Sequence, residues 1–173
     1  MMTEADPSTQ PTLADVTEDC PDCTTYIQES MKTAYRGGFK RAREYYHLKV
    51  PVVEKLREYE NDYTIVAIFA DWCGDARKVI PVLSLLEEQT NFEIRALGGM
   101  VKPPYGEFPK RNWAVPPSPV EVDTFGITSS PTIIIFRKDT GKEIGRIKTR
   151  PRMTNTVEDE ILKIIEDSLK EEQ

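Results

Sequence analysis

A continuous apolar run that leads directly into a helix-like pattern constrains this chain more than any other feature. Residues 63–70, YTIVAIFA, are rich in β-branched side chains, and their length and flanks predict a strand buried on both faces. From Asp75 to about Gln89 the apolar residues recur at helical spacing, which predicts a helix with one face on the sheet. A buried strand followed by such a helix is typical of an α/β fold with a crossover connection.

Further elements extend this pattern on both sides. Residues 91–97 predict a second buried strand, and residues 132–148 predict two antiparallel strands around a turn at 139–141. Helices are predicted over 25–36, within 39–48, from Pro51, over about 118–126 and from about Thr156. The first of these is expected to end at the Gly37–Gly38 pair. The order predicts a central mixed β-sheet flanked by helices.

The acidic residues gather near the N-terminus, where the first 23 residues contain six of them and no lysine or arginine. The remainder of the chain is balanced in charge, whereas a nucleic-acid binder needs a basic face. No apolar run approaches the roughly 20 residues that span a bilayer, and no secretory signal is visible. We therefore expect a cytoplasmic protein that binds neither nucleic acid nor membrane.

The chain divides into three predicted parts. Residues 1–23 are poor in large apolar groups, so they predict a flexible acidic tail, which ends in the sequence CPDC. Residues 24–60 predict an N-terminal helical extension. Residues 61–173 predict the α/β domain, which is long enough to bury a core without disulfide bonds.

Cys73 follows the buried strand and precedes the start of the predicted helix by two residues. The unpaired N–H groups and positive dipole end of a helix favour a thiolate over a thiol, so this cysteine is a candidate nucleophile. Asp71 and Asp75 act against that effect, while Arg77 and Lys78 add to it. The alternative is a buried structural cysteine, because free cysteine is among the most buried residue types.

Three segments carry a resemblance to a known superfamily. VAIFADWCGDARKVIPVL, residues 66–83, resembles the active-site strand, turn and helix of thioredoxins, with Pro81 at the place of the helix-kinking proline. FGITSSPTIIIF, residues 125–136, resembles the segment that carries the cis-proline, and GKEIGRI, residues 141–147, resembles the following strand. The similarity covers about residues 50–170 and implies a thioredoxin-like fold for the domain at 61–173.

The chain is most similar to a branch of that superfamily whose corner reads Trp-Cys-Gly-Asp followed by Cys or Ala, and TRPR, at 149–152, also fits this branch. The resemblance implies a cis bond before Pro131, with the Ser130 backbone facing an extended substrate. It also implies a thiol–disulfide oxidoreductase centred on Cys73. The residues implied to contact substrate are Trp72, Gly74, Asp75, Ser130 and Pro131.

Three departures from the thioredoxin pattern bear on mechanism. Ala76 stands where the second cysteine of the corner lies in thioredoxins, so a dithiol cycle at this corner is excluded. Ala67 replaces the buried acid that serves the second thiol. The segment 98–119 is longer than in a minimal thioredoxin, and its aromatic residues form either a partner surface or a packed connector. These aromatic residues are Tyr105, Phe108 and Trp113.

A single thiol at Cys73 can form a mixed disulfide, a sulfenic acid or a glutathione adduct, and each of these needs a second thiol to release it. Cys20 and Cys23 are candidates for that catalytic role, if the tail brings them to Cys73. The CPDC pair is alternatively half of a zinc site completed by Cys73 and His47, or has no defined role. An external thiol is the other candidate reductant.

Two functions are therefore open. The first is a thiol–disulfide oxidoreductase that acts on a protein or small-molecule disulfide and needs no cofactor or metal. The second is a redox-inactive binding or adaptor protein that uses the cis-proline surface and the long segment, because members of one fold differ in function.

Overall fold

A four-stranded mixed sheet lies at the centre of the computed structural model, which describes residues 9–102 and 113–173. The strand order is β2-β1-β3-β4, with β1 parallel to β2 and β3 antiparallel to both β1 and β4. The strands are β1 (Tyr63–Ile68), β2 (Glu93–Leu97), β3 (Thr132–Arg137) and β4 (Glu143–Lys148). This arrangement confirms the predicted mixed sheet.

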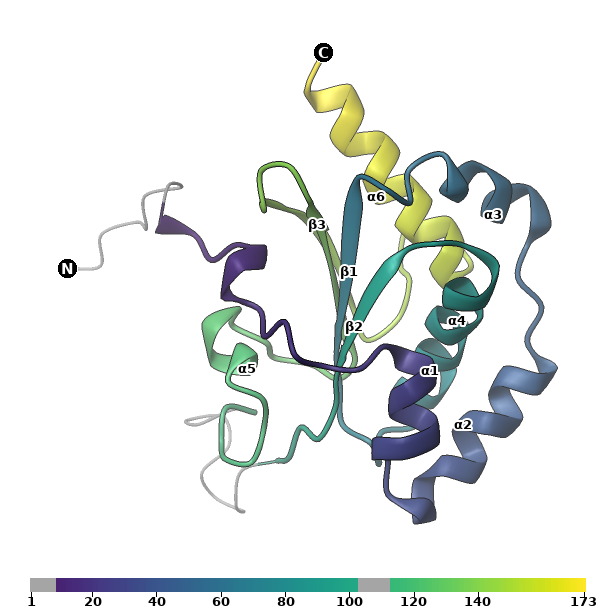
Figure 1. Ribbon diagram of the computed structural model, residues 1–173, viewed down its shortest axis with the longest axis vertical. Coiled ribbons are helices and arrows are strands. Elements are labelled where there is room, and N and C mark those ends of the chain that lie inside the picture. The colour runs from purple at the N-terminus through teal and green to yellow at the C-terminus, as the bar shows by residue number, and fades with distance from the viewer. Residues whose placement is uncertain (1–8, 103–112) are drawn as a thin grey trace.

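Helices cover the two faces of the sheet unequally. Figure 1 shows α1, α2, α3, α4 and α6 on one side of the sheet and α5 on the other. The helical elements are η2 (Leu13–Asp15), α1 (Cys23–Thr25), η3 (Tyr26–Ser30), α2 (Thr33–Tyr45), α3 (Val50–Arg57), α4 (Ala76–Gln89), α5 (Glu121–Thr124) and α6 (Val157–Glu171). The predicted helices at α4 and α6 are confirmed, and the Thr156 side chain caps α6 by accepting from the Asp159 N–H.

The leading helical segment differs from the prediction. α1 passes into a π-helical turn, the chain breaks at Met31, and α2 then continues through Gly37 and Gly38. Glycine disfavours a helix interior, but here the missing side chain makes room for a neighbour. A Cβ atom at Gly38 would lie 2.8 Å from Cδ of Arg77 on α4. Close packing of α2 on α4 therefore explains why the glycine pair does not end the helix.

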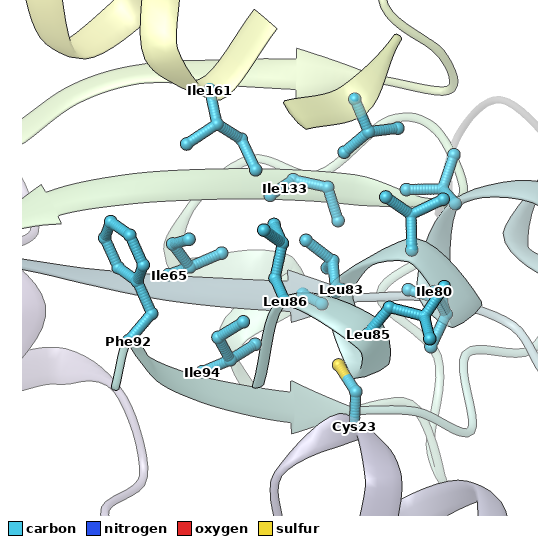
Figure 2. Packing of buried hydrophobic residues seen from close by; sticks show 14 of the residues in the cluster. Cys23, Ile65, Ile80, Leu83, Leu85, Leu86, Phe92, Ile94, Ile133 and Ile161 are labelled. Atoms are coloured by element: carbon cyan, nitrogen blue, oxygen red, sulfur yellow. The ribbon is translucent and has the colours of Figure 1, made fainter. Parts of the chain in front are cut away.

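Alternate residues of β1 divide the apolar core between the two faces of the sheet, and every residue of this strand is buried. Ile65 and Ala67 belong to the larger cluster, which includes Leu83 and Leu86 of α4. Figure 2 shows this cluster around the strands and α4. Val66 and Ile68 belong to a second cluster on the α5 side, with Val122 and Phe125 among its members. The strand is thus covered on both sides, as the uninterrupted apolar run predicts.

Residues 12–22, called the N-terminal strap here, lie against the sheet and are not the mobile tail that the sequence predicts. The Leu13 N–H donates to the Gly141 carbonyl at 2.8 Å, and the Ala96 N–H of β2 donates to the Pro21 carbonyl at 2.8 Å. Val16 is 3% exposed. The strap therefore runs from the β3–β4 turn, past α5, to the free edge of β2 (Figure 1). This corrects the prediction of a flexible tail for these residues.

Two buried or half-buried carboxylates hold the strap and the start of α1. Glu121 is 1% exposed, and it accepts from the Thr17 N–H at 2.8 Å and from the Thr17 hydroxyl at 2.6 Å. Glu87 of α4 accepts from the Cys23 N–H at 2.6 Å and from the Thr24 N–H at 2.8 Å. These N–H groups would otherwise lack partners at the beginning of α1, so Glu87 satisfies them.

We predict that Glu121→Ala releases the strap and lowers the free energy of unfolding by about 1–3 kcal/mol, because the polar groups of Thr17 lose a partner at a buried position. Asp123→Ala, on the exposed side of the same short helix, is the matched control. Urea unfolding gives the free energy, and limited proteolysis reports cleavage within residues 12–22. Equal stability and equal cleavage in the two variants would contradict the role of Glu121.

We predict that Glu87 makes the free energy of unfolding decrease as the pH rises. Burial, which outweighs the hydrogen bonds from Thr24 and Cys23, raises the pKa of Glu87 from 4.5 to about 7. The folded protein holds a proton that the unfolded chain releases, so this stabilisation is complete below pH 4.5 and is lost as the pH rises through about 7. The slope is at most about 1.4 kcal/mol per pH unit.

Urea unfolding of the unaltered protein and of Glu87→Gln, measured at several pH values across this interval, isolates the contribution of Glu87. The stability of the unaltered protein relative to the variant should fall as the pH rises. A difference that stays constant, or that grows, would show that burial does not control this carboxyl group.

Candidate functional site

Cys73 lies at the corner between the end of β1 and the start of α4, as predicted, and it is half-buried. Its Sγ donates to the Ser130 carbonyl at 3.3 Å. Its backbone N–H donates to the Ala70 carbonyl at 3.2 Å, and its carbonyl accepts from the Arg77 N–H at 3.2 Å. The thiol is therefore held at a fixed position close to the first turn of α4 and remains partly accessible.

The Ser130–Pro131 segment packs across this corner. Its peptide bond is cis, the geometry that the resemblance implies. The Ser130 Oγ accepts from the Ala70 N–H at 2.8 Å, and the Pro131 carbonyl accepts from the Thr149 N–H at 2.7 Å. The end of β1, the loop before β3 and the end of β4 are thus joined around the thiol.

Trp72 is 42% exposed beside the thiol. Its ring stacks on Trp113 with centroids 5.9 Å apart, and the Lys102 Nζ lies 5.1 Å from its centroid. The Trp113 Nε1 donates to the Thr128 carbonyl at 3.1 Å, which makes this part of the long segment a packed connector. The other aromatic residues predicted for a partner surface, Tyr105 and Phe108, lie outside the described residues.

A tyrosine that the sequence analysis did not identify contacts the corner from the helical extension. The Tyr26 hydroxyl donates to the Asp71 carboxylate at 2.7 Å, and the Gly99 N–H donates to the same carboxylate at 3.2 Å. Burial, followed by the bond to Asp71, raises the pKa of Tyr26. A Cβ atom at Gly98 would lie 2.2 Å from the Tyr26 ring, so glycine is needed there. No motif spacing links Tyr26 to Asp71, and the contact depends on tertiary packing.

The two remaining predicted substrate-contacting residues lie between Cys73 and α4. Gly74 is exposed, and Asp75 is half-buried at the N-cap position of α4, where its side chain makes no capping hydrogen bond. The Arg77 guanidinium lies close to Gly74, with Nη2 3.8 Å from an ideal Cβ at that glycine. A cation is therefore present at the edge of the corner.

Cys20 and Cys23 pack against opposite faces of the sheet. Cys20 lies against the cluster on the α5 side, and its Sγ donates to the Thr17 carbonyl at 3.4 Å. Cys23 is 0% exposed and points into the cluster on the α4 side (Figure 2). Pro21, between them, bonds to the edge of β2, so the strap crosses the sheet edge between the two thiols. Burial raises the pKa of both thiols.

This placement gives no support for a catalytic CPDC pair. Both thiols are free, and the mobile tail that would deliver them to Cys73 is replaced by a packed strap. His47 is exposed, and no group of three His, Cys, Asp or Glu side chains suited to a metal is found in residues 9–102 and 113–173. The predicted zinc half-site therefore has no partners in that part of the chain.

Comparison with known proteins supports the thioredoxin superfamily. A thioredoxin family model matches residues 20–98. The thioredoxin of Chlamydia caviae is 29% identical over 83 residues, and that of Chlamydia muridarum is 33% identical over 82 residues. These matches cover 48% and 47% of this chain, and 65% and 64% of the two thioredoxins.

Solved structures show the same architecture. A protein of unknown function from Pseudomonas aeruginosa matches with a TM-score of 0.65 and 16% identity, over 92% of this chain and 99% of that protein. An HIV epitope-scaffold protein matches with a TM-score of 0.62 and 16% identity, over 91% of this chain and 99% of that protein. The fold is thioredoxin-like.

The described helices include none with the length and apolar character needed to cross a membrane.

We predict that Cys20 and Cys23 stay reduced when Cys73→Ser is oxidised mildly, because Cys23 would have to leave the core and cross the sheet edge to reach Cys20. Alkylation of the denatured protein after oxidation, followed by mass spectrometry, counts the free thiols. Recovery of a Cys20–Cys23 disulfide under native conditions would show that the strap opens readily and would restore the resolving-pair hypothesis.

Proposed function

We propose that this chain is a thiol–disulfide oxidoreductase that acts through the single thiol of Cys73. The observation that carries the proposal is the position of this thiol, partly exposed at the strand-to-helix corner and in contact with the Ser130 carbonyl. The superfamily matches support the same class of chemistry. The thiolate form of a cysteine is the nucleophile in disulfide exchange.

The reaction has two exchange steps. The Cys73 thiolate attacks one sulfur of a disulfide R–S–S–R′, forms the mixed disulfide Cys73–S–S–R and releases R′ as a thiolate, which takes a proton from solvent. A second, external thiolate R″–S⁻ then attacks the R sulfur of Cys73–S–S–R, forms R–S–S–R″ and displaces the Cys73 thiolate. A further equivalent of the external thiol converts R–S–S–R″ into R–S⁻ and R″–S–S–R″, so the two electrons that reduce the original disulfide come from two molecules of the external thiol.

We assign the second step to an external thiol. Ala76 supplies no sulfur at the corner, and Cys23 is sealed in the core with its N–H bonded to Glu87. Cys20 is half-buried on the α5 side, and burial raises its pKa, so little of it is thiolate at neutral pH. Neither cysteine is prepared for attack in this arrangement.

An extended substrate fits the corner best along the Ser130–Pro131 backbone. Trp72 offers an exposed ring on one side, and the exposed Gly74 adds no side chain of its own next to the thiol. Asp75 and Arg77 add one charge of each sign at the edge of the same corner. These groups position the reacting disulfide, while the exchange itself involves the Cys73 sulfur alone.

A binding function without turnover is the second candidate, and the exposed Trp72 favours it. This ring is backed by Trp113 and covered by Lys102, an arrangement that also suits recognition of a partner. Because the adaptor would not need the thiol, replacement of Cys73 separates the two candidates.

We predict that Cys73 is alkylated faster than Cys20 and Cys23 in the native protein at neutral pH, and that it forms a mixed disulfide with neutral hydroxyethyl disulfide. Intact-mass spectrometry measures both reactions. Cys73→Ser should abolish the adduct, whereas Cys20→Ser should retain it. An unreactive Cys73, together with unchanged partner capture by Cys73→Ser, would favour the adaptor.

A further inference from the structure

A groove runs along the first turns of α4, the helix that begins just after the Cys73 corner. A cavity of about 590 Å³ lies between α2 and α4, where Arg41, Tyr45, Arg77 and Pro81 are among its lining residues. A second cavity of about 280 Å³ lies between α4 and the segment after β4. The two cavities share Tyr46, Lys78 and Val82, so they form one continuous groove around the first turns of α4.

The groove carries an excess of positive charge. Arg41, Arg77 and Lys78 line the larger cavity, which has no acidic lining residue, and Arg150 lines the smaller one, where Asp75 is the single acid. All four cations are exposed, and none has an ion-pair partner among residues 9–102 and 113–173. In contrast, Arg43, on the same helix as Arg41, pairs with Glu88 at 3.0 Å. Four cations and a single acid therefore line this groove, and the described residues form no ion pair with any of the four cations.

Two of the residues that line the cavities are hydrogen-bonded to the corner that carries the reacting sulfur. On one side, Arg77 lies against Gly74 and donates its N–H to the Cys73 carbonyl. On the other side, Thr149 lines the smaller cavity and donates its N–H to Pro131, the residue after the Ser130 that contacts Sγ. The groove therefore adjoins the Cys73 corner, and a molecule held there lies beside the residues that position the thiol.

Resting on the function proposed above, we infer that this groove selects anionic disulfides of low molecular weight, in which peptide-like groups carry carboxylates. The volume of the larger cavity lies in the range of small-molecule sites, and the tyrosine and aliphatic lining suits the apolar parts of a short peptide. Arginine binds carboxylates through paired N–H donors, which gives orientation as well as attraction. The carboxylates would lie along α4 while the disulfide meets Cys73.

Gly38 contributes to this site by its lack of a side chain. Because Arg77 occupies the space beside Gly38, the guanidinium is drawn from α4 toward α2 and lines the groove from the end nearest Cys73. The glycine within α2, which is unfavourable for the helix itself, thus has a role in placing a cation.

The test compares three disulfides that differ in charge. We expect oxidised glutathione, which carries two carboxylates on each half, to form the Cys73 mixed disulfide faster than its tetraethyl ester, in which all four carboxylates of the same peptide skeleton are esterified. Neutral hydroxyethyl disulfide gives the reference rate. The ratio of the glutathione rate to the reference rate should fall several-fold in Arg41→Glu and in Arg150→Glu, and it should fall with added salt. Arg41 lies on α2 and Arg150 follows β4, so neither belongs to the turn that carries Cys73.

Lys55→Glu is the matched control, since it makes the same charge change on the exposed face of α3, outside the groove. Binding of S-methylglutathione, which cannot exchange, gives a second readout by titration of Cys73→Ser. Equal rates for the acid and the ester, or the same fall in Lys55→Glu, would overturn the inference while leaving the proposed function intact. Failure of Cys73 to react even with hydroxyethyl disulfide would refute the proposed function, and this inference with it.

Discussion

The candidate site depends on Ser130, which holds two parts of the corner at once. Its hydroxyl oxygen accepts from the Ala70 N–H at the end of the central strand, and its carbonyl accepts from the Cys73 thiol. Ala70 in turn accepts from the Cys73 N–H. A loop that is distant in sequence therefore fixes both the backbone and the sulfur of the corner. The fold brings β1 and β3 together as antiparallel neighbours, and this pairing places Ser130 where both contacts form.

The helical extension and the strap complete the surroundings of that corner. Tyr26 reaches Asp71 from the extension, and the strap carries Cys20 and Cys23 to opposite faces of the sheet. The thioredoxin-like body thus has additions that are integral to its packing. The corner carries the Cys73 sulfur, and Ala76 supplies no second sulfur there. The sulfurs of Cys20 and Cys23 pack against the two apolar clusters.

The features that were predictable from the sequence are those that local patterns determine. The run 63–70 and the periodicity that follows it identified β1 and α4. A buried strand gives a continuous apolar run, and a helix with one buried face gives apolar residues at helical spacing. The position of Cys73 followed from those two elements. The strap was missed because its order comes from distant partners, Glu121 and Gly141, and its composition alone is typical of a tail. Its Thr12 to Asp15 capping box was a local signal of structure.

Pro21 has a consequence for the sheet as a whole. An edge strand such as β2 exposes a row of unpaired N–H and C=O groups, to which another chain can add a strand. The Pro21 carbonyl accepts a hydrogen bond from one of those N–H groups, that of Ala96. Proline has no N–H of its own, so it cannot donate a hydrogen bond back to a carbonyl of β2. The strap therefore covers the edge without becoming a strand, and it ends the ladder there. A single imino acid thus occupies one hydrogen-bonding position of this edge, which leaves one fewer for the strand of another chain.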